Sequence, residues 1–148
     1  MVSNGEVTQK VVVHFADGRT IWGFIPESTG RSEGTLTAEA MEVTDTDGKC
    51  LKIQPADVKA IFLVRSFEGD PNYAEYKSFI DRSTGNGVWL RVHFQDGEIL
   101  EGVGPNTLAT FLDSMFYLTP PDPRSNNHAV LVSKSSLSQM QVLGLAAS

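Results

Sequence analysis

The chain has 148 residues, of which 41% are hydrophobic and 20% charged, and a formal net charge of −6 at pH 7. This composition is ordinary for a globular protein, and an acidic balance without any run of Lys or Arg disfavours duplex nucleic acid and anionic membranes as partners. The single cysteine, Cys50, excludes a scaffold held by internal disulfides. No apolar stretch approaches the ~20 residues needed to cross a bilayer, and residues 1–6 lack signal-peptide features, so a cytoplasmic location is expected.

In the first part of the chain, apolar side chains such as Val11, Val13 and Phe15 recur with the period of two that is typical of a β-strand. Asp17-Gly18 follows, a dipeptide that accepts the positive φ of a tight hairpin turn. The same argument, continued along the chain, predicts strands over residues 11–15, 20–25, 35–44, 49–53 and 58–64. A short polar segment over residues 54–57 is expected to form one turn of 3₁₀ helix.

Residues 66–87 contain Gly, Asp, Pro and Asn around a segment with helical spacing. Tyr73, Tyr76, Phe79 and Ile80 fall on one face of a helix, and Pro71 suits a helix start. The sequence therefore predicts a linker with a short amphipathic helix over residues 73–80.

The remaining part of the chain repeats the pattern of the first. Val13-His14-Phe15-Ala16-Asp17-Gly18 matches Val92-His93-Phe94-Gln95-Asp96-Gly97, which fixes an offset of 79 residues, and Gly23 then matches Gly102. The same offset places Leu51, Ile53, Val58 and Ile61 on Val130, Val132, Leu137 and Met140. Strands are predicted over residues 90–94, 99–103, 111–118, 129–132 and 137–143, with a 3₁₀ turn at 133–136. Matching blocks at a constant spacing indicate an internal repeat.

Small SH3-like and Sm-like barrels have four antiparallel strands, followed by a 3₁₀ turn and a fifth strand, and their closure removes exposed strand edges. The predicted fold is therefore all-β, with two tandem five-stranded Sm/SH3-like barrels joined by a short helical linker. The units span residues 8–65 and 88–144, and the linker spans residues 66–87.

The outward positions of the two predicted units differ in polarity. In the first unit, Val12, Trp22, Phe24, Ala60 and Phe62 are expected to face outward, whereas their equivalents in the second are Arg91, Glu101, Val103, Gln139 and Gln141. An apolar outer face needs cover, either from the linker and the second unit or from another molecule. The candidate interaction surface consists of Val12, Trp22, Phe24, Phe62 and Tyr73.

Residues 12–24 resemble the first hairpin of Sm and Lsm proteins, in which an Asp-Gly turn is followed by a glycine in the second strand. The whole chain also resembles an uncharacterised group of bacterial proteins with an Sm-like barrel, on two stretches: Phe67-Glu68-Gly69-Asp70-Pro71 and Pro120-Pro121-Asp122-Pro123-Arg124-Ser125-Asn126-Asn127. The resemblance implies a fold and no activity.

Sm proteins hold RNA with Asp and Asn in one loop and an Arg-Gly pair in another. Here Gln54-Pro55-Ala56-Asp57 and residues 133–136 stand at the Arg-Gly positions, so those elements are missing.

Candidate catalytic and metal-binding residues are few. His14 and His93 are equivalent in the repeat, but no ligand spacing accompanies them, and strand residues are the ordinary interpretation. Asp17 and Asp96 are explained by turn chemistry. Asn126-Asn127-His128 could suggest an oxyanion hole or a nucleotide contact, although a rigid turn accounts for it. No metal site and no cofactor is predicted.

The sequence thus favours a protein of unknown function that is not an enzyme. The first hypothesis is an interaction or assembly module that binds a protein partner or self-associates, for example as a homo-oligomer. The alternative is a single-stranded RNA-binding protein of the Lsm type, which would bind short RNA in a salt-sensitive way.

Overall fold

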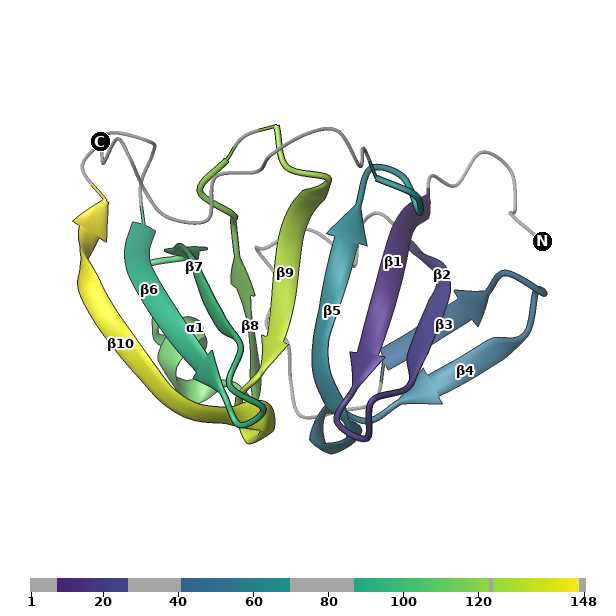
Figure 1. Cartoon of the computed structure of the whole chain (residues 1–148), viewed down its shortest axis with the longest axis horizontal. Helices are drawn as coiled ribbons and strands as arrows, with labels where there is room; N and C mark the ends of the chain where they lie inside the picture. The colour runs from purple at the N-terminus through teal and green to yellow at the C-terminus, as the bar shows by residue number, and fades with distance from the viewer. Residues whose placement is uncertain (1–7, 27–40, 70–86, 123, 147–148) are drawn as a thin grey trace.

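The computed structural model describes residues 8–26, 41–69, 87–122 and 124–146, whose strands form two antiparallel sheets (Figure 1). The strands of the first part are β1 (Thr8–Phe15), β2 (Thr20–Pro26), β3 (Met41–Asp45), β4 (Cys50–Ile53) and β5 (Val58–Val64). Those of the second part are β6 (Gly87–Phe94), β7 (Ile99–Gly104), β8 (Met115–Leu118), β9 (Asn127–Ser133) and β10 (Leu137–Ala146). The helical segments are η2 (Pro55–Asp57), α1 (Leu108–Leu112) and η3 (Lys134–Ser136). The all-β class and both 3₁₀ turns are confirmed.

Two Asp-Gly turns start the two parts in the same way. Gly18 and Gly97 have φ values of 96° and 99°, in the left-handed region that favours glycine. Asp17 Oδ1 accepts a hydrogen bond from the amide of Arg19 at 3.0 Å, and Asp96 Oδ1 accepts one from the amide of Glu98 at 2.9 Å. Both predicted hairpins are confirmed, and each carboxylate fixes its own turn.

The larger sheet has seven strands in the order β4-β3-β2-β1-β5-β9-β8, and the smaller has three in the order β10-β6-β7. β5 pairs antiparallel with β9, so strands from the two parts of the chain lie side by side. The register places Ala60 opposite Val132 and Leu63 opposite Ala129. A bridge between Val103 and Thr119 links β7 to the end of β8.

The prediction of two closed barrels is wrong. The larger sheet ends at β4 and β8 and the smaller at β10 and β7, so neither closes on itself. The physical reason is that β9, a strand of the second part, occupies the edge of β5. Among the described residues no helix joins the two parts, in contrast to the predicted helical linker. The helix α1 lies inside the second part, and its end overlaps the start of the strand expected over residues 111–118. Residues 73–80, and residues 35–40 of the expected third strand, lie outside the described residues.

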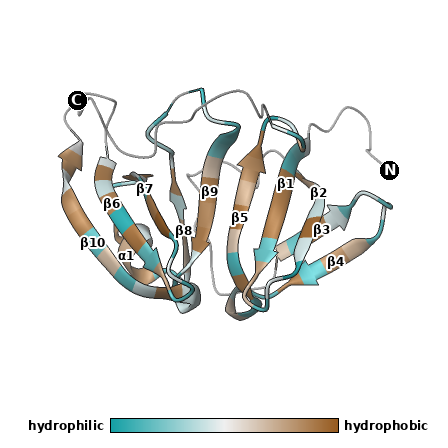
Figure 2. Ribbon diagram, in the orientation of Figure 1, coloured by the Kyte–Doolittle hydropathy of each residue, from teal (hydrophilic) through white to brown (hydrophobic). Residues whose placement is uncertain are grey.

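The hydrophobic core has two clusters, and each takes side chains from both parts of the chain. The first cluster surrounds Val11, Val13 and Ile61, and it also contains residues of β8 and β9, namely Met115, Tyr117 and Leu131. The second surrounds Leu90, Val92 and Phe94, and Ala60 and Phe62 of β5 pack into it. Figure 2 shows the hydrophobic stretches of β5 and β9 running side by side through the middle of the molecule.

β5 is therefore covered on both faces, which explains its nearly continuous apolar sequence. Ile61 and Leu63 point into the first cluster, as predicted. Ala60 and Phe62, expected to face outward, instead contact the second cluster, so for these two residues the cover comes from within the chain. None of the helices in the described part of the chain is long and apolar enough to span a membrane.

Candidate interaction surface

An apolar row crosses three neighbouring strands of the larger sheet. Trp22 in β2 lies opposite Val12 in β1, and Val12 lies opposite Phe62 in β5. Directly opposed residues of antiparallel strands share a face of the sheet, so the three side chains are neighbours. Trp22 is 47% exposed, and Val12 and Phe62 are half-buried. We refer to Trp22, Val12 and Phe62 as the apolar strip.

The other two predicted residues relate to this strip in different ways. Phe24 lies two residues beyond Trp22 on the same face and opposite Lys10. Its ring packs edge-on against Phe67, with 5.6 Å between the ring centroids. Tyr73 lies outside the described residues. The structure thus brings Val12, Trp22 and Phe62 together and places Phe24 beside them.

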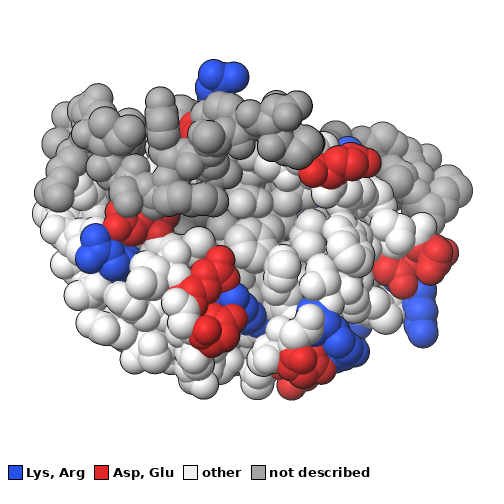
Figure 3. Space-filling view, in the orientation of Figure 1, with Lys and Arg blue, Asp and Glu red and all other residues white. Residues whose placement is uncertain are grey.

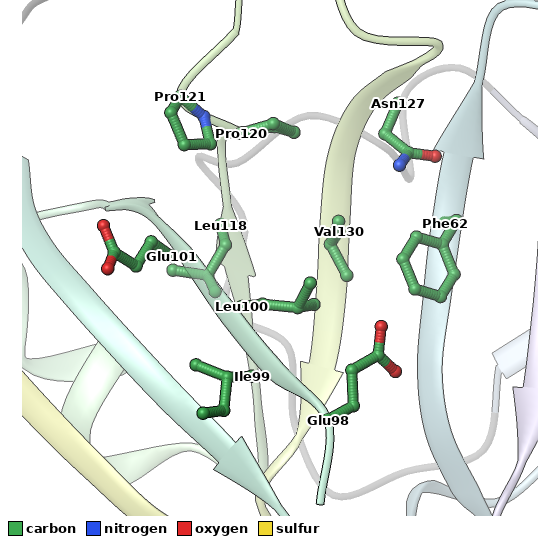
Figure 4. Close-up of a pocket in the computed structure, with 10 residues that line it drawn as sticks. All are labelled: Phe62, Glu98, Ile99, Leu100, Glu101, Leu118, Pro120, Pro121, Asn127 and Val130. Carbon is green, nitrogen blue, oxygen red and sulfur yellow. The ribbon is translucent and has the colours of Figure 1, made fainter. Parts of the chain in front are cut away.

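The strip continues into a cleft of about 120 Å³ between β5 and β9 on one side and β7 on the other. Its lining residues come mainly from the second part of the chain and are Phe62, Glu98, Ile99, Leu100, Glu101, Leu118, Pro120, Pro121, Asn127 and Val130. Figure 4 shows the two prolines at one end of the cleft, Glu98 and Ile99 at the other, and Leu100 between them. Ile99 is 53% exposed, so the wall formed by β7 is both apolar and accessible.

Sequence reasoning missed this cleft because its walls meet only through the pairing of β5 with β9. Phe62 was identified as an outward apolar residue, but Ile99 and Val130 were interpreted only as strand residues. The exposed apolar residues Leu108 and Leu112 of α1 were missed as well, since that segment was not expected to be helical. The polarity of the second part was therefore overestimated.

Charged groups beside the cleft are paired with one another. Lys59 contacts the carboxylates of Asp96, at 2.7 Å, and Glu98, which ties β5 to the turn between β6 and β7. Burial lowers the pKa of Lys59, but the hydrogen bonds to these two carboxylates outweigh burial and raise it overall. Arg91 Nη2 lies 2.8 Å from Glu101 Oε2. Figure 3 shows Lys and Arg groups beside Asp and Glu groups along the lower side of a largely uncharged face.

The rings of His14 and His93 each contact a side chain of a neighbouring strand. The ring of His14 packs edge-on against Phe62, with 4.9 Å between centroids, and burial followed by the charge of Lys59 lowers its pKa. His93 Nε2 lies 3.0 Å from Oε1 of Gln141 on the outer face of the smaller sheet. Among the residues that the structure describes, no three His, Cys, Asp or Glu side chains converge in a way that could hold a metal ion.

The turn between β8 and β9 clamps the segment that follows β5. Asn126 Oδ1 accepts a hydrogen bond from the amide of Ser66 at 3.1 Å, and its Nδ2 donates to the carbonyl of Ser66 at 2.9 Å. The amide of Arg65 donates to the carbonyl of Asn126, and Gly69 lies against the Asn126 side chain. The two sequence stretches that carry the resemblance to bacterial proteins thus touch each other, and Asn126 has a structural role in the turn.

The chain matches the model of a family of unknown function (DUF6982) over residues 7–144. No curated protein and no solved structure matches it. Because the family match covers most of the chain, the protein belongs to this family. The match carries neither a fold name nor an activity, so the resemblance to Sm-like proteins stays a prediction.

Proposed function

We propose that this member of the DUF6982 family is a non-enzymatic interaction and assembly module, built from two copies of one β-unit. It binds a protein partner that inserts an apolar side chain between β5 and β7. The observation that carries the proposal is the continuity of the exposed Trp22 with the apolar strip and the cleft. Apolar surface of this kind is typical of contact sites when it is contiguous rather than scattered.

The size of the cleft supports a side-chain guest. A dry cavity of about 150 Å³ admits a benzene molecule, and this cleft of about 120 Å³ is somewhat smaller and open at one side. It therefore has room for one side chain of about the size of Leu. Trp22 would then provide a large, rigid contact beside the guest, the role that aromatic residues commonly have at interfaces.

The charge distribution favours protein over RNA as the ligand. Arg19, Lys59 and Arg91 each contact a carboxylate, so a phosphate group would have to displace an existing ion pair. Affinity for single-stranded nucleic acid normally rests on cations that follow the backbone together with stacking aromatic residues. Trp22 supplies a stacking group, but the three cations are neutralised by neighbours within the chain.

The experiment is a selection from a displayed library of random peptides against the full chain, followed by measurement of the enriched peptides by isothermal titration calorimetry. Enriched peptides should share one large apolar residue, and replacing that residue by Ala should weaken binding at least tenfold. The variants W22K and I99K, each at an exposed position, should weaken the same peptides at least tenfold.

The matched control is L112K, which removes an equally apolar but more exposed residue on α1, away from the cleft. This variant should bind the selected peptides with unchanged affinity. Equal loss in all three variants, or enrichment of peptides without an apolar anchor, would contradict the proposed site. Binding of a short single-stranded RNA that weakens steeply with salt would favour the alternative function instead.

A further inference from the structure

The edge of β7 that borders the cleft is open along its first residues. β7 is the end strand of the smaller sheet. On its free side it meets the larger sheet at the bridge between Val103 and Thr119, where each amide donates to the other residue's carbonyl, at 2.9 and 2.8 Å. Among the described residues, no strand continues this pairing along residues 99–101. An open edge offers backbone donors and acceptors to any strand that can align with it.

Two prolines explain why β8 does not continue along β7. Antiparallel pairing that starts at Val103 and Thr119 would place Pro121 opposite Glu101. Proline has no amide hydrogen, so it cannot donate to the carbonyl of Glu101. The chain leaves the ladder at this point, and Pro120 and Pro121 line one end of the cleft (Figure 4). β8 therefore ends where a further strand has room to begin.

The backbone of β7 is oriented for such a strand. Val103 directs its amide and carbonyl away from β6, into the bridge described above. These directions alternate along a strand, so Glu101 and Ile99 direct theirs to the same free side. The hydrogen bond from the amide of Phe94 to the carbonyl of Glu98 agrees with this alternation, because it points the carbonyl of Glu98 toward β6.

The side chains along this stretch alternate between the two sides of β7. Figure 4 shows Leu100 pointing into the cleft, toward Val130, whereas Ile99 and Glu101 point to the other side. Ile99 and Glu101 nevertheless line the cleft, as expected if their backbone forms part of its wall. A strand beside β7 would therefore direct the side chain opposite Leu100 into the cleft and the two flanking side chains away from it.

The end of the cleft at Glu98 has more negative than positive charge. Lys59 contacts the carboxylates of both Asp96 and Glu98, so two carboxylates share one ammonium group. The side chain of Glu98 is 46% exposed. In a strand antiparallel to β7, the residue two positions after the one opposite Leu100 would lie opposite Glu98. A Lys or Arg there would form a favourable cross-strand pair.

We infer that the partner binds as an extended segment that pairs antiparallel with β7 along residues 99–101 and continues the line of β8. One apolar side chain, the anchor, lies opposite Leu100 and enters the cleft, and a Lys or Arg two residues later lies opposite Glu98. The segment exchanges backbone hydrogen bonds with Ile99 and Glu101, and such bonds are the usual source of affinity when a strand is added to a sheet edge. The inference rests on the proposed function and adds the conformation, direction and charge pattern of the partner.

The first part of the chain offers a matched edge away from the cleft. The 79-residue offset places Thr20 of β2 at the position of Ile99. The amide of Phe15 donates to the carbonyl of Arg19, so the amide of Thr20 also points away from the neighbouring strand of its hairpin. The described pairing of β2 with β3 begins at Gly23, and Thr20 does not line the cleft.

The first test compares variants of the full chain for binding of the peptides selected from the random library, by isothermal titration calorimetry. I99P removes an amide hydrogen that the smaller sheet does not use, and I99A shortens the same side chain but keeps the amide. I99P should bind at least tenfold more weakly than I99A. The control variants T20P and T20A should bind within twofold of each other. Thermal unfolding of each variant checks that it remains folded.

The second test leaves the protein unchanged and modifies the peptide. N-methylation of the residue on either side of the anchor removes a donor to a carbonyl of β7 and should weaken binding at least tenfold. N-methylation of the anchor itself, whose amide points away from β7, should change affinity less than threefold. Replacing the basic residue two positions after the anchor by Gln should weaken binding at least threefold, and high salt should reduce this difference.

The remaining outcomes separate the inference from the proposed function. Anchored peptides that tolerate N-methylation at both flanking positions, or that bind I99P and I99A equally, would overturn the inference and leave the proposed function in place. A basic residue two positions before the anchor would overturn the assigned direction. A wild-type mass that rises with concentration, and that I99P but not T20P keeps monomeric, would overturn the inference by identifying a second copy as the occupant. A library without anchored binders would overturn both proposals.

Discussion

Replacing Leu131 by Ala tests whether the two parts of the chain form one folding unit. Leu131 belongs to β9 in the second part, yet it is 1% exposed and packs in the first core cluster opposite Ile61. Truncation of a fully buried Leu to Ala costs about 2–5 kcal/mol, because the cavity adds to the lost transfer free energy. A loss of about 3 kcal/mol changes the folding equilibrium roughly a hundredfold.

The assay uses the two tryptophans of the chain, Trp22 in the first part and Trp89 in the second. In W89F and W22F backgrounds, urea unfolding followed by fluorescence reports on one part at a time. Both reporters should give the same midpoint, and L131A should shift both by the same amount. The control is K52A, at an exposed position of β4, which should change stability by less than about 0.5 kcal/mol.

A shift seen only through Trp89, with the Trp22 transition unchanged, would refute this reasoning. It would mean that β9 can leave the first core cluster without unfolding it, and that the two parts are independent domains. Two separate transitions in the wild-type chain would lead to the same conclusion.

Two further predictions concern contacts between strands and between the parts. G102A should destabilise the chain by about 1–3 kcal/mol in urea unfolding, because a Cβ at Gly102 would lie 2.8 Å from the carbonyl oxygen of Thr119. The control variant G144A should be nearly neutral, since a Cβ at Gly144 would have no neighbour within 4 Å. Equal effects of the two variants would contradict the close approach of β7 and β8. K59M should lower the unfolding midpoint at pH 7. The difference in midpoint between K59M and the wild type should narrow as the pH falls below about 4. The hydrogen bond from Lys59, followed by that from the Glu98 amide, lowers the pKa of Asp96, so the stabilisation is present above the carboxyl's ordinary value of 3.8 and is lost as the folded-state group protonates. A gap that stays constant down to pH 2 would show that Asp96 and Lys59 do not interact.

Most of the local structure follows from the sequence, because the signals are local. Period-two alternation around Val13 and the dipeptides Asp17-Gly18 and Asp96-Gly97 gave strands and turns in the right places. The closure of the sheets could not be obtained in this way. Whether the edge of β5 meets a strand of its own part or β9 depends on contacts between distant segments, and the same apolar sequence fits either pairing.

The candidate site was predictable only in part, for the same reason. Alternation identified Val12, Trp22 and Phe62 as members of one face, and the register places them in one row. The opposite wall, which includes Ile99, comes from β7, and no sequence signal joins it to Phe62. The helix α1 was not predicted, and its last two residues were taken as the start of the strand over residues 111–118. Its segment is short and its apolar residues Leu108 and Leu112 are exposed, so burial gives no helical period.

The central claim is that β5 and β9 join the two parts into one body, whereas β4 and β10 are edge strands of the described sheets. Residue-resolved amide hydrogen exchange of the dilute chain tests it most directly. The amides of Leu63 and Leu131 should exchange only through global unfolding, and those of Cys50 and Val142 should exchange orders of magnitude faster. Fast exchange along β9, at rates matching those of β4, would show that the two parts are not joined in this way.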